Sequence, residues 1–146
     1  MNRIKTFFPK GKVKIQSLPI IVPPSAKPKK GPKRILLEKG ELAEIYNSPQ
    51  PIRHIAYVEF LKGRARGGHY HHRQGFFYII RGEMELEMVD VTTGAREKTK
   101  IKEGDFISFS PKIAHIIKPI KSGHAIEFSI SHFKPEDTIK YEFKSK

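Results

Sequence analysis

Cysteine is absent from the 146 residues of this sequence, and so are long apolar runs. Without cysteine the chain can form no disulfide and offers no thiolate, so any metal would be held by imidazole or oxygen atoms. The longest uninterrupted apolar run, residues 76–80, is far shorter than the ~18–20 residues that a membrane-spanning helix needs. The first residues also lack an apolar secretion signal. We therefore expect a soluble, cytoplasmic protein with no membrane partner.

Acidic residues are scarce in the first part of the chain. Residues 1–40 contain eleven lysines and arginines but only one acid, Glu38, and the whole chain has a net charge of +13. This charge favours anionic partners such as phosphorylated metabolites, and a lysine-rich surface that only aids solubility is the alternative. No nucleic-acid recognition motif accompanies the basic residues, and few aromatic residues are interleaved with them. We therefore expect no nucleic-acid partner.

Convincing long helices are also lacking. Short strand-like runs alternate with glycine and proline turns, which predicts a single all-β domain of the sandwich or barrel type. The clearest periodicity lies at residues 83–88, where glutamates alternate with Met84, Leu86 and Met88. We expect a basic, proline-rich N-terminal extension (residues 1–33), a barrel (34–133) and a C-terminal tail (134–146).

Two parts of the extension carry separate expectations. Residues 27–34 form a basic run that we expect to be a solvated loop. Residues 13–22 are apolar and are predicted to form one edge strand or two short ones. No neighbouring segment is available to pair with this strand, and an unpaired strand edge is prone to associate with another chain. The sequence therefore predicts a homodimer in which this segment joins a sheet edge.

Residues 68–72 read Gly-His-Tyr-His-His. Alternate side chains of a strand face the same side, so His69 and His71 share a face and His72 points away. Two imidazoles on one face can bind one metal ion, or can place a base beside a second polar group. For this stretch alone, a surface cluster of histidines is the alternative.

A second set of residues follows at a characteristic spacing. Gly82 lies thirteen residues after His69, and Gly104 is followed by Pro111 and then by His115, eleven residues after Gly104. Together with the histidine stretch, this pattern resembles the two-part signature of the cupin superfamily. The resemblance implies a single-domain jelly-roll barrel whose two signature halves lie on adjacent strands.

The resemblance covers residues 63–119 and also bears on metal binding. It implies that His115 faces His69 and His71 across the barrel. Metal-binding cupins usually carry a glutamate seven residues before the closing glycine of the first motif, and this chain has Gly75 there. Three histidines can still bind zinc or iron. A site of these three histidines is therefore the alternative to a pocket that requires no metal.

A longer, patchy resemblance extends over residues 35–136. The sequence Arg-Gly-Gly-His-Tyr-His at residues 66–71 is similar to motifs of two families of sugar-nucleotide-modifying cupins. These are the dTDP-4-dehydrorhamnose 3,5-epimerases and the dTDP-4-keto-6-deoxyglucose 3,4-ketoisomerases. Residues 109–115 and 131–136 resemble further segments of the epimerases. The likeness implies an isomerase or epimerase that acts on a nucleotide-linked 4-keto-6-deoxy sugar, with His69 as the catalytic base.

Imidazole chemistry agrees with this interpretation. A 4-keto sugar has acidified protons beside its carbonyl, and a histidine near neutral pKa can remove one and return it elsewhere without a metal or redox cofactor. We predict His71 and Arg66 as the other catalytic residues, because Arg66 can stabilise the developing enolate or hold the diphosphate. Four further residues are predicted to contact the substrate: Tyr57, Tyr78, His115 and Glu127.

Two other classes of function stay open. One is a metal-dependent cupin, such as a small oxygenase, that uses His69, His71 and His115. The other is a non-catalytic module that binds a sugar or an effector. For the two tyrosines, packing in the barrel core is the alternative to substrate contact.

Overall fold

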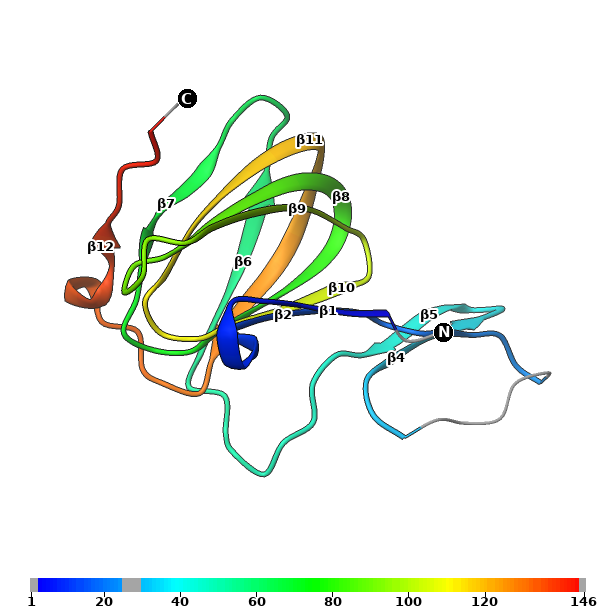
Figure 1. Cartoon of the computed structure of the whole chain (residues 1–146). Helices are drawn as coiled ribbons and strands as arrows, with labels where there is room; N and C mark the ends of the chain where they lie inside the picture. The colour runs from blue at the N-terminus through cyan, green and yellow to red at the C-terminus, as the bar shows by residue number, and fades with distance from the viewer. Residues whose placement is uncertain (1–2, 25–29, 145–146) are drawn as a thin grey trace.

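The computed structural model describes residues 3–24 and 30–144, and strands account for most of these residues (Figure 1). In this described part, no helix has the length and apolar character needed to cross a membrane. The two helical segments are single 3-10 turns, η1 (Pro9–Gly11) and η2 (Pro135–Asp137). The strands are β1 (Arg3–Phe7), β2 (Val13–Ser17), β3 (Ile20–Ile21), β4 (Lys33–Leu37), β5 (Gly40–Glu44), β6 (His54–Phe60), β7 (Arg66–Tyr70), β8 (Gly75–Asp90), β9 (Arg96–Lys102), β10 (Asp105–Phe109), β11 (Ile113–Ser129) and β12 (Ile139–Lys140).

Two long strands, β8 and β11, pair with each other along most of their length and are the main strands of the barrel. Both bend near Gly82 and Gly123, where the register of their pairing shifts. Gly82 has a φ of 105°, and a Cβ on Gly123 would overlap the carbonyl of Arg81. Glycine at both positions therefore lets the two strands cross closely while they turn.

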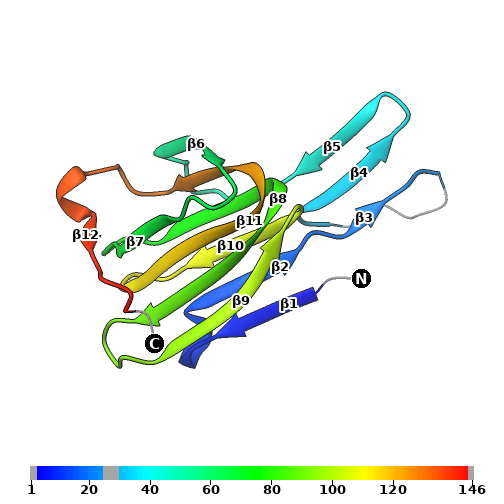
Figure 2. The ribbon, with the colours of Figure 1, turned by 90° about the horizontal axis from the view of Figure 1, so that it is seen from above.

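The bend gives each long strand a place in both faces of the barrel. The first half of β8 pairs with β10, which continues to β2 and β1, while the second half of β11 pairs with β6. The second half of β8 pairs with β9, while the first half of β11 pairs with β7 and then β12. The views in Figures 1 and 2 show these strands curving around a common interior. The all-β jelly-roll fold predicted from the sequence is thus confirmed.

Apolar side chains fill the space between the two faces. Met84, Leu86 and Met88 are fully buried, while the glutamates that alternate with them are partly exposed, as the periodicity of this segment predicts. The same core includes Val13 and Ile15 of β2. Burial of these side chains is what holds β2 against the barrel, since apolar burial stabilises by roughly 25 cal/mol per Å².

The N-terminal segment is arranged differently from its prediction. Residues 13–22 form two short strands, β2 and β3, and β2 pairs with β1 and with β10 of the same chain. The argument that this strand lacks a partner is therefore wrong. The division at residue 34 also differs, because β1 and β2 belong to the main sheet while β4 and β5 lie outside it. Of the basic run at residues 27–34, residues 27–29 lie outside the described part of the chain.

A small second sheet, formed by β3, β4 and β5, projects from one end of the barrel (Figures 1 and 2). Arg34 of β4 joins this sheet to the barrel. Its buried guanidinium binds Glu41 of β5 and Glu103 of the β9–β10 turn, with N···O distances of 2.9 Å to each. It also packs against Gly104, where a Cβ would come within 2.7 Å of Arg34 Nη1. This contact fixes the direction in which the small sheet projects.

The pairing of β7 with β11 depends on Gly67. Its φ is 105°, and a Cβ there would lie 2.6 Å from the carbonyl oxygen of His115. The register is irregular at this point, with His69 opposite His115 and Gly67 opposite Ile116. The close approach of the two backbones places His69 directly beside His115.

We predict that Gly67→Ala is more destabilising than Gly94→Ala. Both glycines have positive φ, so each substitution costs about 1–2 kcal/mol of backbone strain. Gly94 has open space around it, whereas the Gly67 methyl group meets the His115 backbone, which adds about 1–3 kcal/mol. Urea unfolding of both variants measures the difference. Equal losses of unfolding free energy would show that β7 does not need this close contact.

Candidate active site

Three histidines from the two halves of the motif meet inside the barrel. His69 lies in β7, His71 follows the end of that strand, and His115 lies in β11. The ring centroids are 4.9 Å apart for His69 and His71, 5.1 Å for His69 and His115, and 6.2 Å for His71 and His115. One nitrogen from each ring lies within 4.8 Å of the others. The cluster that the cupin resemblance implies is therefore present.

His115 is the innermost of the three. Its ring is buried, stacks on Phe109 at a centroid distance of 4.6 Å, and meets the edge of Phe77. Its Nδ1 lies 3.3 Å from the carbonyl of Ile113, which can only accept, so Nδ1 carries the proton and donates. Burial, reinforced by the nearby His69, lowers the pKa of His115 to about 3. The ring is neutral at physiological pH, and its Nε2 is unprotonated.

His71 is oriented by the C-terminal tail. Its Nδ1 donates to the backbone carbonyl of Asp137 over 2.9 Å, which leaves Nε2 as the unprotonated nitrogen of the neutral ring. Arg73 Nη1 lies 3.3 Å from the same Nδ1, and a positive charge there opposes protonation of the ring. Burial and the Arg73 charge lower the pKa of His71, and the Asp137 carbonyl partly offsets them.

The ring of His69 has no hydrogen-bond partner among the residues that the structure describes. Burial lowers its pKa, and the neighbouring His71 and Arg73 lower it further. All three imidazoles are therefore neutral at pH 7 and able to accept a proton. A neutral imidazole with a free nitrogen suits either a general base or a metal ligand.

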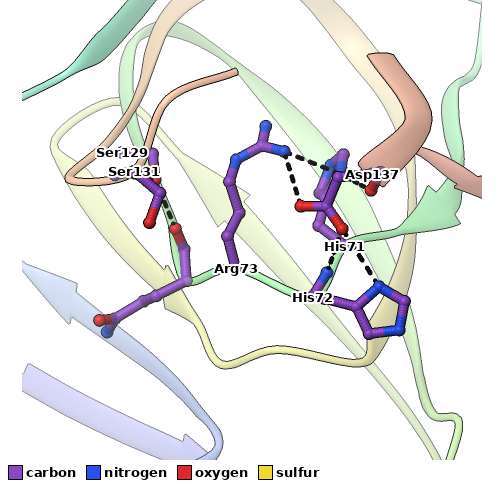
Figure 3. A network of polar contacts seen from close by, with 7 residues as sticks. His71, His72, Arg73, Ser129, Ser131 and Asp137 are labelled. Carbon is purple, nitrogen blue, oxygen red and sulfur yellow. Dashed lines mark hydrogen bonds and ion pairs between the residues drawn. The ribbon is translucent and has the colours of Figure 1, made fainter. Parts of the chain in front are cut away.

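A network around Asp137 supports this arrangement (Figure 3). One carboxylate oxygen accepts from the backbone N–H and the ring Nδ1 of His72, at 2.8 and 3.1 Å. The other accepts from Arg73 Nη1 at 3.3 Å. These bonds hold η2 against the segment between β7 and β8. The exposed His72 ring binds Asp137 and lines neither cavity, and because His71 and His72 follow the end of β7, strand parity does not apply to them.

The three histidines line a cavity of about 150 Å³. A smaller cavity of about 20 Å³ adjoins the histidines, and several residues line both cavities. Apolar side chains form much of the wall of the larger cavity, and the polar groups converge on one part of that wall, as is usual for small-molecule sites. Its lining residues are Val58, Phe60, Arg66, Gly67, His69, His71, Arg73, Phe77, His115, Ile117, Glu127, Phe133 and Thr138.

The other predicted site residues fall into two groups. Arg66 lines the cavity from an exposed position, where its Nε donates to the backbone carbonyl of Glu59 over 2.8 Å. Glu127 lines both cavities. The two tyrosines line neither. Tyr57 is 64% exposed and contacts His124, while Tyr78 is buried in the charged surroundings of Arg34, so their positions do not support substrate contact.

Two site residues were missed by sequence reasoning. Arg73 follows the histidine motif directly, yet nothing in the pattern indicates that its side chain turns inward. Asp137 lies 66 residues beyond His71 in the tail, so only the fold brings it to the site. Both residues contact His71 and therefore help to orient it.

The histidine cluster also suits a metal ion in its donor chemistry. Imidazole nitrogens are common ligands of zinc and iron, and three neutral rings offer three of them. A tetrahedral zinc site needs nitrogens about 3.4 Å apart, given Zn–N bonds of about 2.0–2.1 Å. The nitrogens here are separated by up to 4.8 Å, so the rings would have to move slightly closer together to bind one ion. Glu127, which lines the same cavity, is the nearby carboxylate.

The fold and the pocket together define a jelly-roll barrel with a histidine-lined interior site. The family model for the cupin domain matches residues 56–128, which is half of the chain. The protein belongs to the cupin family, as its sequence signature predicts. No curated protein sequence matches the chain.

Solved structures with the same fold include several sugar-nucleotide enzymes. The dTDP-4-dehydrorhamnose 3,5-epimerase from Sulfolobus tokodaii is 16% identical, with a TM-score of 0.72 over 94% of this chain and 80% of that chain. The TDP-quinovose 3,4-ketoisomerase WlaRB from Campylobacter jejuni is 15% identical, with a TM-score of 0.68 over 88% and 92%. The epimerase RmlC from Legionella pneumophila, in complex with dTDP-4-keto-L-rhamnose, is 14% identical, with a TM-score of 0.72 over 96% and 77%. At these identities the likeness establishes the fold.

We predict that His115 makes stability fall as the pH drops below about 6.5, the ordinary pKa of histidine. Its pKa is lowered in the folded state, so only the unfolded chain takes up the proton between pH 6.5 and about 3. Stability from this group is therefore full above pH 6.5 and is lost as the pH falls. From pH 7.5 to pH 5 the loss is about 2 kcal/mol. Urea unfolding at both values measures it, and His115→Gln should remove that part of the loss.

An NMR titration of the wild-type protein checks the same point without a substitution. The ring-proton shifts of His115 should stay constant between pH 7.5 and 5. A His115 ring that titrates near pH 6.5 contradicts the neutral, buried assignment.

Proposed function

We propose that the protein is an isomerase or epimerase that moves a proton on a nucleotide-linked 4-keto-6-deoxy sugar. The observation that carries this proposal is the meeting of three neutral imidazoles in one pocket with Arg66 at its rim. The pocket supplies bases at neutral pH and a cation for a phosphate or an enolate, which is what this chemistry requires.

Proteins with the same fold support the choice of substrate. The RmlC structure from Legionella pneumophila contains dTDP-4-keto-L-rhamnose. A histidine-to-asparagine variant of the 3,4-ketoisomerase QdtA from Thermoanaerobacterium thermosaccharolyticum contains TDP-4-keto-6-deoxyglucose. In this chain the excess of positive charge favours a ligand that carries a diphosphate.

Each site residue has its own role in the proposed reaction. An unprotonated nitrogen of His69 takes the proton from a carbon beside the sugar carbonyl, and the electron pair of the broken C–H bond forms an enolate. Arg66 stabilises the enolate oxygen or holds the diphosphate. His71, fixed by Asp137, positions the sugar or relays the proton, which returns to the opposite face or to a neighbouring carbon. His115 forms the floor of the pocket. The reaction needs no cofactor.

We predict that His69→Asn abolishes most proton exchange while leaving the fold and nucleotide-sugar binding intact. Asparagine keeps the approximate shape of the side chain but cannot act as a base, and loss of a general base costs about 10²–10⁴-fold in rate. Deuterium uptake at the sugar carbons, followed by NMR in D₂O, measures the effect. Thermal unfolding of the variant confirms that it is folded.

The matched control is His132→Asn, because His132 is exposed and lines neither cavity. His72 is less suitable, since it binds Asp137 and so contacts the network that orients His71. The control should exchange at the wild-type rate. If His69→Asn also does so, His69 is not the base.

A three-histidine metal centre is the second candidate, and the convergence of three neutral imidazoles on one cavity is the observation that favours it. His69, His71 and His115 would hold the ion, which when bound would supply Lewis-acid or oxygen chemistry. Under our proposal, protein purified without chelator contains well under one transition-metal ion per chain. Elemental analysis of the folded protein measures this content. A stoichiometric, tightly held metal would favour the second candidate.

We also propose that the protein is a homodimer, now on different grounds. A sheet as small as β3–β5 is marginal without further packing, and it leaves Ile20 and Leu36 exposed on one face and Leu42, which is 58% exposed, on the other. Exposed apolar side chains on a projecting sheet can be buried by association with another chain. A second copy is the fitting occupant, because the barrel exposes Ile55 and Tyr57 of β6 and a two-fold pair can bury both surfaces.

Light scattering at micromolar concentration should give a dimer mass for the wild type. Leu42→Lys should shift the protein toward monomer, because it puts a charge into the apolar contact. Leu61→Lys is the control, since Leu61 is similarly exposed but lies in the β6–β7 loop. A monomeric wild type would overturn the proposal.

A further inference from the structure

The Arg73 guanidinium binds Asp137 through Nη1, while its Nε has no partner among the described residues. The side chain is 11% exposed, its Nη1 binds Asp137, and its guanidinium carbon lies 5.6 Å from the centroid of the Phe133 ring. Its Nε is buried and has no hydrogen-bond partner among residues 3–24 and 30–144. In Figure 3 this nitrogen lies on the side of the group away from Asp137. A buried donor left unpaired costs about 1–3 kcal/mol, so a ligand that satisfies it gains affinity.

Glu127 is a half-buried acceptor that lines the same cavities. Its side chain lines both cavities, as Arg73 does, and neither a hydrogen bond nor an ion pair joins it to another described residue. Arg73 and Glu127 thus share a pocket without binding each other. The two cavities are therefore lined by a donor and by an acceptor that do not bind each other.

The charges around this part of the pocket favour a neutral ligand group. Asp137 forms an ion pair with Arg73 and so offsets its positive charge, while the Glu127 carboxylate lines the same cavity. An anionic ligand group is therefore better placed at the rim beside Arg66. A hydroxyl group can accept from Arg73 and donate to Glu127 at the same time.

We propose that Arg73 and Glu127 recognise ring hydroxyl groups of the sugar and so determine which sugar the pocket accepts. This inference rests on the proposed function. It adds Arg73 to the site as a specificity-determining residue and gives Glu127 a defined partner on the substrate.

Calorimetric titration of the full chain tests the inference with two probes. One is a dTDP-linked 6-deoxyhexose without a keto group, which binds but does not react, and the other is dTDP alone. Arg73→Lys keeps the charge and the contact with Asp137 but loses Nε–H, while Glu127→Gln loses the strong acceptor. Each should weaken binding of the sugar nucleotide about 10- to 100-fold and leave dTDP binding unchanged. Arg3→Lys, on the distant β1, should alter neither.

The outcomes separate the inference from the proposed function. A wild type that binds the sugar nucleotide more tightly than dTDP, with variants that retain this preference, overturns the inference alone. Variants that lose both probes equally, or that melt at a lower temperature, show a structural role and also overturn it. A wild type that binds neither probe overturns the proposed function and this inference with it.

Discussion

The close pairing of β7 with β11 is the constraint on which the site depends. Gly67 lets the two backbones approach so closely that a side chain there would meet the carbonyl of His115. The irregular register that results sets His69 opposite His115, and the chain that follows β7 brings His71 to the same side. The two halves of the cupin motif are thus joined by backbone contact. No further strand or helix is needed to bring their histidines together.

Burial then decides what these histidines can do. The apolar wall and the proximity of the three rings make protonation unfavourable, and the positive charge of Arg73 adds to the effect. The C-terminal turn η2 fixes His71 through the Asp137 carbonyl, and the Asp137 carboxylate holds Arg73. The result is a set of neutral, oriented imidazoles at physiological pH. The same property serves proton transfer and metal binding, so geometry alone allows both.

Much of the fold and part of the site could be predicted from the sequence. The alternation at residues 83–88 predicts a half-buried strand, and the resemblance to the cupin signature implies that His115 meets His69 and His71. The pairing of β2 with β10 could not be predicted, because Asp105 lies 88 residues from its partner Ser17, whereas β1, the other partner, precedes β2 directly and was not recognised as a strand. Strand parity alone does not say which face of a strand turns inward.

The site residues that were missed share one cause. Arg73 and Asp137 act through contacts that only the folded tail creates, and neither belongs to a spacing pattern. Of the two tyrosines, Tyr78 is buried, as the packing alternative predicts. Tyr57 lies on the face of β6 that also carries Glu59, where its side chain is exposed and contacts His124.

Solvent exchange by the wild-type protein tests the central claim most directly. Chelator-treated protein is incubated in D₂O with a dTDP-linked 4-keto-6-deoxy sugar, and deuterium at the carbons beside the carbonyl is followed by NMR. A histidine base that acts without metal predicts deuterium uptake that chelation does not diminish. Bound sugar nucleotide without exchange, or exchange that vanishes on chelation and returns with zinc or iron, would contradict the account.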